Sequence, residues 1–348
     1  MDDLILKSVI EITRQRDTDS LELSLVTTLA QFVPASAITL YESFGEGPTD
    51  AVDEVVRLSI TPNGRYGRDY NWSTGKKTIT PDDQLRNCLQ SSSIVVVETS
   101  AGTTLLHYPI FSEHKVRGAL ALECREDPFS WRPIIEALIT VYGNYLTVLN
   151  ESERDKLTGL LNRRTFDRKL DKLLKAQRDN QVTNKYTSAG SEHRHVDTKS
   201  NAWLAMVDID HFKRINDTYG HLFGDEVLLT LSQKIRRFFR KSDLMFRFGG
   251  EEFVIVLEPI PAESAKRTLD RFSQAIASHN FPQIGKITVS VGYAGISETD
   301  FPQVVLERAD KALYFAKDNG RNCVFNYEEL VANGQLKERP SAQSVTLF

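Results

Sequence analysis

The stretch that decides the fold of the C-terminal half is Arg247-Phe-Gly-Gly-Glu-Glu-Phe253. Apolar runs flank it at 244–248 and 253–257, and each has the length and composition of a strand. Two glycines between two strands predict a tight hairpin whose backbone adopts positive φ. Because glycine has no side chain, a bulky ligand would also reach the backbone there. We therefore expect a β-hairpin with a ligand site at its tip.

Four carboxylates gather at the ends of two predicted strands. Glu251 and Glu252 directly follow the two glycines of the turn. Asp208 and Asp210 lie at the C-terminal end of the apolar run 202–209 (AWLAMVDI). Residues i and i+2 share one face of a strand, and hard cations such as Mg²⁺ prefer carboxylate oxygens. If the hairpin packs beside this strand, Glu251 completes a metal site. The alternatives are a helix N-cap for Asp210 and solvated glutamates at the turn.

Two further motifs suit a nucleotide. The run His211-Phe-Lys-Arg-Ile-Asn-Asp-Thr-Tyr-Gly-His221 contains Asn216, and Asp225 follows shortly after it. An amide and a carboxylate suit guanine, whose N1–H and N2–H₂ groups donate to a carboxylate as adenine does not. Near the end of the last predicted helix, Lys317 and Arg321 would reach phosphates. The alternative for these cations is an interaction with the helix dipole.

Helices and strands alternate through the rest of the C-terminal half, as in α/β or α+β domains. Segment 177–200 is polar and aperiodic, which predicts a loop, and its His193 and His195 are expected to be solvated rather than to bind metal. The remaining predicted elements are helices at 165–176, 225–239, 262–278 and 302–319 and a strand at 287–293.

Residues 1–130 predict a separate α+β domain with an antiparallel sheet. A helical pattern over 21–32 precedes an extended run at 37–41. The later strand candidates are 94–98, 105–111 and 116–124, the last two joined by a hairpin turn at 112–115.

Residues 131–156 predict one long helix that joins the two domains. Apolar side chains recur there at spacings of three and four, the pattern of a heptad seam: Ile135, Leu138, Tyr142, Tyr145 and Leu149. Two interpretations remain open. The stripe pairs with a second copy in a parallel dimer, or it packs on its own domain.

Composition narrows the function classes. The 348 residues include 43 Lys+Arg and 47 Asp+Glu, a net charge of −4, and 41% are hydrophobic, as in soluble proteins of about two domains. The charge balance excludes a bulk polyanion binder, so we expect no nucleic-acid partner. The three cysteines, Cys88, Cys124 and Cys323, predict idle thiols in a reducing cytoplasm. No signal peptide or membrane segment is expected.

Four motifs together resemble the GGDEF family of diguanylate cyclases. They are Asp155-Lys-Leu-Thr-Gly-Leu-Leu-Asn-Arg163, the block from Asp208 to Asp225, Gly249-Gly-Glu-Glu-Phe253 and Ala309-Asp-Lys-Ala-Leu-Tyr-Phe-Ala-Lys-Asp-Asn-Gly-Arg321. The resemblance implies a palm-like fold and the condensation of two GTP into cyclic di-GMP and two pyrophosphates. It also implies a homodimer, because each domain would hold one GTP. The alternative is a catalytically weak relative that binds GTP or cyclic di-GMP as an effector.

The resemblance also assigns roles to residues. Mg²⁺, or Mn²⁺ in its place, would be held by Asp208, Glu251 and the Ile209 carbonyl, with Asp210 less directly involved. Glu251 and Glu252 would be the catalytic pair, and Glu251 or a nearby metal-bound hydroxide would help to deprotonate the ribose 3′-OH. The other substrate contacts would be Phe212, Lys213, Asn216, Asp225, Gly249, Gly250, Lys317 and Arg321.

Two more segments carry resemblances. Arg240-Lys-Ser-Asp243 lies six positions before Gly249, counted from Asp243, and resembles the family's product-inhibition site. An arginine fork suits the phosphates and guanine of cyclic di-GMP. In the first domain, Tyr108-Pro-Ile-Phe together with Val116-Arg-Gly-Ala-Leu-Ala-Leu122 resembles GAF domains, with a PAS domain as the alternative. The expected order is a GAF-like α+β sensor at 1–130, a signalling helix at 131–156, the GGDEF domain at 157–328 and a tail at 329–348.

Overall fold

A computed structural model describes residues 2–43, 51–60, 66–69, 77–98, 102–112, 115–125, 129–171, 173–174, 201–240, 242–297 and 300–337. Segment 177–200, with its two histidines, lies outside the described residues. The chain divides into two compact units, Met1–Glu153 and Arg154–Phe348. Across the described part of the chain, no helix has the length and apolar character needed to cross a bilayer.

The first unit is built on one antiparallel sheet with the strand order β3-β2-β1-β7-β6-β5, and β4 also pairs with β2. The predicted hairpin is confirmed, because β6 and β7 pair directly and Ser112 lies opposite Lys115. The strands are β1 (Ala35–Ser43), β2 (Val52–Ile60), β3 (Tyr66–Asp69), β4 (Lys77–Ile79), β5 (Val95–Glu98), β6 (Thr104–Ser112) and β7 (Lys115–Cys124).

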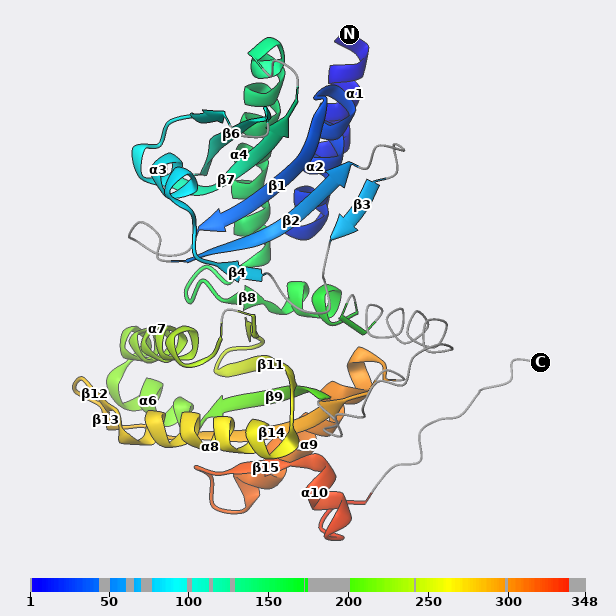
Figure 1. The fold of residues 1–348 in the computed structure, drawn as a ribbon. Helices are drawn as coiled ribbons and strands as arrows, with labels where there is room; N and C mark the ends of the chain where they lie inside the picture. Colours follow the sequence, from blue (N-terminus) through cyan, green and yellow to red (C-terminus); the bar gives the residue numbers. More distant parts are fainter. Residues whose placement is uncertain are drawn as a thin grey trace, which may run out of the picture. The chain divides into compact units, whose positions relative to one another are not determined.

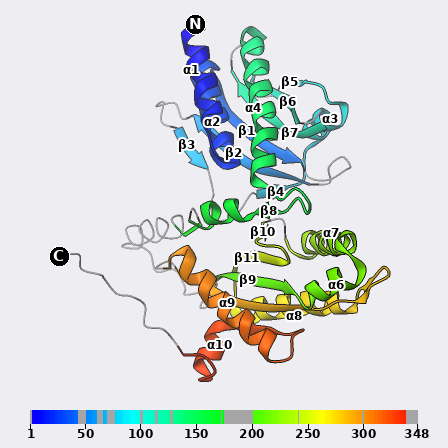
Figure 2. The same cartoon turned by 180° about the vertical axis from the view of Figure 1, so that it is seen from behind.

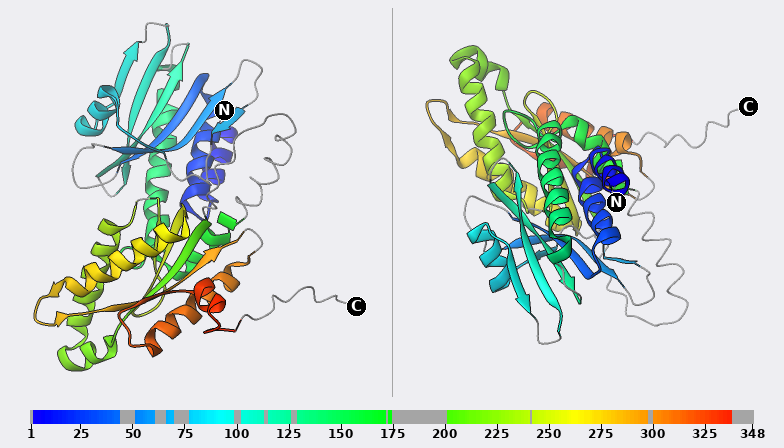
Figure 3. Two further views of the ribbon diagram at one scale, coloured as in Figure 1. Left: turned by 60° about the horizontal axis from the view of Figure 1, so that its bottom comes forward. Right: turned by 90° about the horizontal axis from the view of Figure 1, so that it is seen from above.

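Helices cover both faces of this sheet. The main core lies under α1 (Asp2–Thr13), α2 (Thr18–Phe32) and α4 (Arg132–Glu153), which follows the short 3-10 helix η1 (Phe129–Trp131). The helix α3 (Asp83–Ser91) packs a smaller apolar cluster on the other face, and Figure 3 shows it across the sheet from the other helices. Cys88 and Cys124 are buried, and burial raises the pKa of their thiols to about 12 and about 11. Both thiols are therefore neutral at ordinary pH.

The heptad stripe of α4 faces the core of its own unit. Ile135 and Leu138 are 0% and 1% exposed, and Tyr142 and Leu149 lie in the same core. The Tyr145 hydroxyl donates a hydrogen bond to the Gln15 carbonyl at 2.9 Å. Of the two interpretations left open, the structure therefore shows the packing of the stripe on its own domain. A helix that covers a sheet and a short coiled coil share the same three-four spacing, so the sequence pattern could not separate them.

The second unit contains a sheet with the strand order β15-β14-β9-β11-β10-β8, and the separate pair β12-β13. The four inner strands pair antiparallel and the two edge strands pair parallel, which gives the mixed α/β content that was expected. The strands are β8 (Leu161–Asn162), β9 (Asn201–Ile209), β10 (Leu244–Arg247), β11 (Glu252–Ile260), β12 (Asn280–Phe281), β13 (Gly285–Lys286), β14 (Val289–Ile296) and β15 (Val324–Asn326).

Alternation along β9 divides this unit into two cores. Trp203, Ala205 and Val207 pack toward the helices α6, α7 and α8, whereas Leu204 and Met206 pack toward α9 and α10. Figures 1 and 2 view the two faces, with α8 in front in the first and α9 in front in the second. By the same alternation, Asp208 falls on the α9 side. The helices are α6 (Phe212–Tyr219), α7 (His221–Phe238), α8 (Ala262–Ser278), α9 (Pro302–Asp318) and α10 (Tyr327–Ala332).

The helix α9 lies directly on β14 because of a glycine. A Cβ added at Gly292 would collide with backbone atoms of Leu313 and Ala309 in α9. The close approach brings the C-terminal end of α9, which carries Lys317, against the sheet. The helix α7 begins earlier than expected, at His221, because Gly220 at φ +88° ends α6 and allows a new helix to start immediately.

The inward orientation of α4 can be tested with two substitutions on opposite faces. Leu138→Ala should lower the free energy of unfolding by about 2–5 kcal/mol, because it removes a buried side chain and leaves a cavity. Val148, 55% exposed on the same helix, is the control, and Val148→Ala should cost less than about 0.5 kcal/mol. Urea unfolding of the full chain, followed by circular dichroism, measures both changes. Equal losses would contradict the assignment of the buried face.

Candidate active site

Carboxylates meet at the C-terminal end of β9. Asp208 lies directly opposite Glu252 in the β9–β11 ladder, so the two side chains share one face of the sheet. The Asp208 side chain is buried, and its Oδ2 lies 2.8 Å from the Lys317 Nζ. The hairpin therefore packs beside the strand as expected, and it brings Glu251 to the same strand end.

The acidic groups at this strand end disfavour one another's ionisation. Burial raises the pKa of Asp208, and Glu252 and Asp210 raise it further, although Lys317 opposes the shift. Burial also raises the pKa of Glu251, followed by repulsion from Asp208, and Lys317 again lowers it. Negative charge is thus concentrated where water is scarce, and Lys317 offsets it only in part.

This donor set fits a divalent cation that also contacts a ligand. The described residues contain no group of three or more His, Cys, Asp or Glu side chains that would hold a metal ion unaided. Asp208 and Glu251 would therefore need further oxygens, from a main-chain carbonyl such as that of Ile209 and from a bound phosphate. Mg²⁺ commonly binds in this way, through one or two carboxylates plus substrate phosphates.

Asp210 has a different environment from Asp208. Its carboxylate accepts hydrogen bonds from the hydroxyls of Thr288 and Ser290 and from the backbone N–H of Asn322. The N-cap position of α6 is occupied by His211, which makes no side-chain capping bond. The N-cap interpretation of Asp210 is therefore wrong, because its carboxylate is directed toward β14 and the turn after α9.

The Gly-Gly turn is tight but does not use positive φ. Gly249 and Gly250 are not among the positive-φ glycines of the described residues, so that expectation is wrong. A Cβ at Gly249 would lie 2.6 Å from Glu252 Oε2, whereas a Cβ at Gly250 would meet nothing within 4 Å. The fold therefore does not itself require the second glycine. The open space at Gly250 suits close approach of a ligand.

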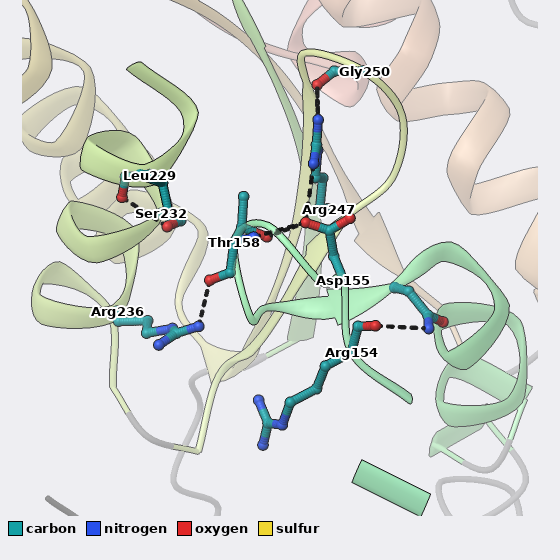
Figure 4. Close-up of polar contacts among 9 residues, drawn as sticks. Arg154, Asp155, Thr158, Leu229, Ser232, Arg236, Arg247 and Gly250 are labelled. Carbon is teal, nitrogen blue, oxygen red and sulfur yellow. Dashed lines mark hydrogen bonds and ion pairs between the residues drawn. The ribbon is translucent and has the colours of Figure 1, made fainter. Parts of the chain in front are cut away.

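Arg247 holds this turn in place, a role that motif spacing did not indicate (Figure 4). Its Nη2 donates to the Gly250 carbonyl at 2.9 Å, and its Nη1 donates to Asp155 at 3.0 Å. Burial opposes ionisation of Asp155, but hydrogen bonds from Thr158 and Arg247 outweigh it and lower its pKa. Arg236 adds a hydrogen bond to the Thr158 carbonyl at 2.6 Å. The first turn of the second unit and the Gly-Gly tip are thereby linked through one guanidinium.

The two predicted guanine readers lie on adjacent helices. A Cβ at Gly224 would collide with the Asn216 side-chain oxygen, so that amide lies beside the residue before Asp225. Asp225 is exposed, whereas the Phe212 ring is buried in the core. Of the expected substrate contacts, Phe212 can therefore contribute only its main chain, because its ring is not accessible to a ligand.

Anion-binding groups surround the same strand end. Because α6 lacks a side-chain N-cap, its first backbone N–H groups remain available, as in helix termini that bind phosphate. Lys213 is exposed in this first turn. Arg321 lies in a turn of left-handed residues, between Gly320 at φ +105° and Asn322 at φ +49°. These candidate phosphate contacts therefore come from two separate segments, the start of α6 and the turn after α9.

The RxxD segment joins α7 to β10 through a buried carboxylate. Asp243 accepts from the backbone N–H groups of Arg240 at 2.9 Å and Glu258 at 3.0 Å. Burial raises the pKa of Asp243, and these two hydrogen bonds partly oppose the shift. Arg240 itself is exposed. Asp243 is thus a structural anchor of the turn, and Arg240 is the member of the pair that a ligand can reach.

Known proteins match the part of the chain that carries these motifs. A sequence model of the GGDEF family, described as a diguanylate cyclase GGDEF domain, matches residues 152–323. Diguanylate cyclase DgcP of Pseudomonas aeruginosa is 38% identical over 171 residues, 48% of this chain and 23% of DgcP. Diguanylate cyclase DgcZ of Escherichia coli is 37% identical over 203 residues, 57% of this chain and 61% of DgcZ. The crystal structure of the GGDEF domain of DgcB from Caulobacter crescentus with c-di-GMP shares 33% identity, covers 51% of this chain and 94% of that one, and has a TM-score of 0.43.

Residues 152–323 are therefore a domain of the GGDEF family, as the four motifs implied. The chain spans less than two thirds of the length of DgcP and of DgcZ, and the matched part of this chain is its C-terminal half.

The burial of Glu251 and its repulsion by Asp208 predict a pH dependence of stability. The pKa of Glu251 is raised above its ordinary value of 4.5, so the folded protein keeps this proton to a higher pH than the unfolded chain. The contribution of this group to the free energy of unfolding is therefore lost as the pH rises from the pKa of the unfolded chain through the raised pKa of the folded protein. Glu251→Gln should remove this loss and raise the free energy of unfolding at pH 7 by less than about 1 kcal/mol.

Urea unfolding at several pH values between about 4 and 7 measures this effect. The exposed Glu226→Gln on α7 is the matched control and should leave the pH profile unchanged. A Glu251→Gln variant that is less stable than the wild type at pH 7 would contradict the repulsion.

Proposed function

We propose that this protein is a diguanylate cyclase that condenses two GTP molecules into cyclic di-GMP and two pyrophosphates. The observation that carries the proposal is the meeting of Asp208, Glu251 and Lys317 at the end of β9. The adjacent Gly-Gly turn leaves open space at Gly250. A buried aspartate and a half-buried glutamate beside a lysine suit a metal-bound triphosphate. The membership of residues 152–323 in the GGDEF family supports the same reaction.

Asp208, Glu251 and the Ile209 carbonyl would hold Mg²⁺, or Mn²⁺ in its place. When bound, the ion would neutralise charge on the phosphate oxygens. The residues around it would orient the substrate. Asn216 and Asp225 would bind the guanine edge, while the N–H groups at the start of α6 and the Lys213 side chain would bind phosphate. Lys317 would leave Asp208 for the triphosphate, with Arg321 on its β/γ end.

The proposed reaction has a simple balance of bonds. The ribose 3′-oxygen of one GTP bonds to the α-phosphorus of the other, and the bond from that phosphorus to the β-phosphate oxygen breaks. Pyrophosphate leaves with the electron pair. The raised pKa of Glu251 makes it a stronger proton acceptor than an ordinary glutamate, so it would help to deprotonate the 3′-OH, with Glu252 beside it. Most of the acceleration would then come from positioning and charge neutralisation.

The reaction requires two domains, each with one GTP, to face one another, so we propose a homodimer. The pairing surface would lie outside the buried stripe of α4. Feedback inhibition by cyclic di-GMP would use Arg240, whose backbone Asp243 holds in position.

The first unit would be a GAF-like sensor, with a PAS domain as the alternative. Its antiparallel sheet supports a sensor fold, and the two segments that resemble GAF domains fall on the paired strands β6 and β7.

Product analysis tests the proposed activity. Incubation of the full chain with GTP and Mg²⁺ should yield cyclic di-GMP and pyrophosphate, whereas ATP should yield no cyclic dinucleotide. Glu251→Gln should lower turnover by at least about a hundredfold, because it removes a catalytic carboxylate. Glu226→Gln is the matched control. Binding of GTP without product would favour the effector alternative, and full turnover by Glu251→Gln would remove the assigned role of Glu251.

Product inhibition can be tested separately. Arg240→Ala should raise the inhibition constant for cyclic di-GMP by about tenfold or more, since it removes a charge-assisted contact to phosphate or guanine. The initial rate without product should stay the same. Arg237→Ala, an exposed arginine of α7, is the control. Equal inhibition constants for Arg240→Ala and the wild type would exclude this site.

A further inference from the structure

The Asp210 carboxylate joins three segments that are far apart in the sequence. Its Oδ1 accepts from the Ser290 hydroxyl at 2.6 Å. Its Oδ2 accepts from the Thr288 hydroxyl at 2.6 Å and from the backbone N–H of Asn322 at 3.0 Å. The side chain is buried, so these bonds form where water does not compete. The end of β9, the start of β14 and the turn after α9 therefore meet at one group.

The turn held by Asp210 has an unusual backbone. Gly320, Arg321 and Asn322 have φ values of +105°, +62° and +49°, and the left-handed region is unfavourable for arginine. The Arg321 N–H donates to the Ala316 carbonyl at 3.0 Å, which fixes one side of the turn to α9. The bond from Asn322 to Asp210 fixes the other side. Arg321 is exposed between these two attachments.

Asp210 and Asp208 differ in the partners that bind their carboxylate oxygens. The partner of Asp208 is the Lys317 ammonium, at the end of a flexible side chain that can move to a phosphate. The partners of Asp210 are the Asn322 backbone N–H and two short hydroxyl side chains, Thr288 just before β14 and Ser290 on it. A cation at the Asp210 Oδ2 would displace bonds that hold the turn, whereas a cation at the Asp208 Oδ2 would replace the lysine.

We propose that Asp210 is a positioning residue, which fixes the turn at 320–322 so that Arg321 is presented to the β/γ end of a bound guanosine triphosphate. This inference rests on the proposed function, because it takes GTP as the ligand of the same site. Asp210 acts through hydrogen bonds to the turn and does not ligate the metal.

Three variants at Asp210 and its neighbour separate positioning from metal binding. Asp210→Ala removes the acceptor for Asn322. Asp210→Asn keeps an oxygen that accepts from Asn322 and Thr288, while its amide NH₂ donates to the Ser290 oxygen. Ser290→Ala is the control, since it removes one bond to the same carboxylate without touching the turn.

The measurement is calorimetric binding to the full chain in Mg²⁺, with two probes. The α,β-methylene analogue of GTP keeps all three phosphates and cannot react, and GMP lacks the β- and γ-phosphates. Asp210→Ala should weaken binding of the analogue about tenfold, as expected for a displaced charge-assisted contact, and leave GMP binding unchanged. Asp210→Asn should restore most of the lost affinity, and Ser290→Ala should leave the ratio of the two affinities as in the wild type.

A double-mutant cycle identifies the residue through which Asp210 acts. In an Arg321→Ala background, Asp210→Ala should cause no further loss of analogue affinity. Additive losses, or an equal loss of GMP affinity, would overturn the proposal. So would an Asp210→Asn variant that needs as much additional Mg²⁺ for analogue binding as Asp208→Asn does, because that result would make Asp210 a metal ligand.

Hydrogen exchange on the wild type gives a test that needs no variant. The Asn322 amide should exchange slowly although its residue is exposed, and rapid exchange would overturn the link to Asp210. The outcomes also distinguish this inference from the proposed function. Product formation with additive losses defeats only the positioning role, and analogue binding without product formation defeats only the cyclase. A wild type that binds neither probe defeats both.

Discussion

The site depends on the burial of negative charge at the end of one strand. Asp208 ends β9 opposite Glu252, and Glu251 follows the adjacent turn, so ladder pairing itself places like charges side by side. Directly opposed like charges destabilise a sheet. Lys317 reduces this cost, and it arrives because α9 lies against β14 at Gly292. A glycine in one strand thus decides whether the lysine reaches the carboxylates of another.

Two hydrogen-bonded centres hold the irregular segments around this charge. Arg247 links the carbonyl of Gly250 to Asp155, at the first turn of the second unit. Asp210 links the left-handed turn after α9 to the start of β14. Neither segment belongs to a helix or a strand, and both carry groups that the proposed reaction needs. Positional accuracy in the site therefore comes from side chains that bind backbone groups, in addition to the sheet itself.

Much of this arrangement was predictable from periodicity and composition. The strands around the Gly-Gly turn, the hairpin of the first unit and the helix 262–278 follow from local patterns and are confirmed. The structure decided one open alternative and corrected one prediction, each for a physical reason. A coiled coil and a helix that covers a sheet share the spacing of the α4 stripe, so the sequence left both open, and the stripe packs on the sheet of its own unit. The Gly-Gly turn avoids positive φ, so backbone strain does not explain its glycines: a Cβ at Gly249 would meet the Glu252 carboxylate, and Gly250 faces open space.

The sequence by itself determined which chemical groups the second unit offers and the strand faces on which they lie. Alternation along 202–209 already assigns Asp208 to the face of Leu204 and Met206, because side chains of a strand alternate strictly. Only the tertiary structure decided the partners of these groups. Asp210 bonds to residues 78, 80 and 112 positions away, and Arg247 bonds to a carboxylate 92 positions away. Such partners depend on the packing of helices on the sheet, which short-range patterns do not encode.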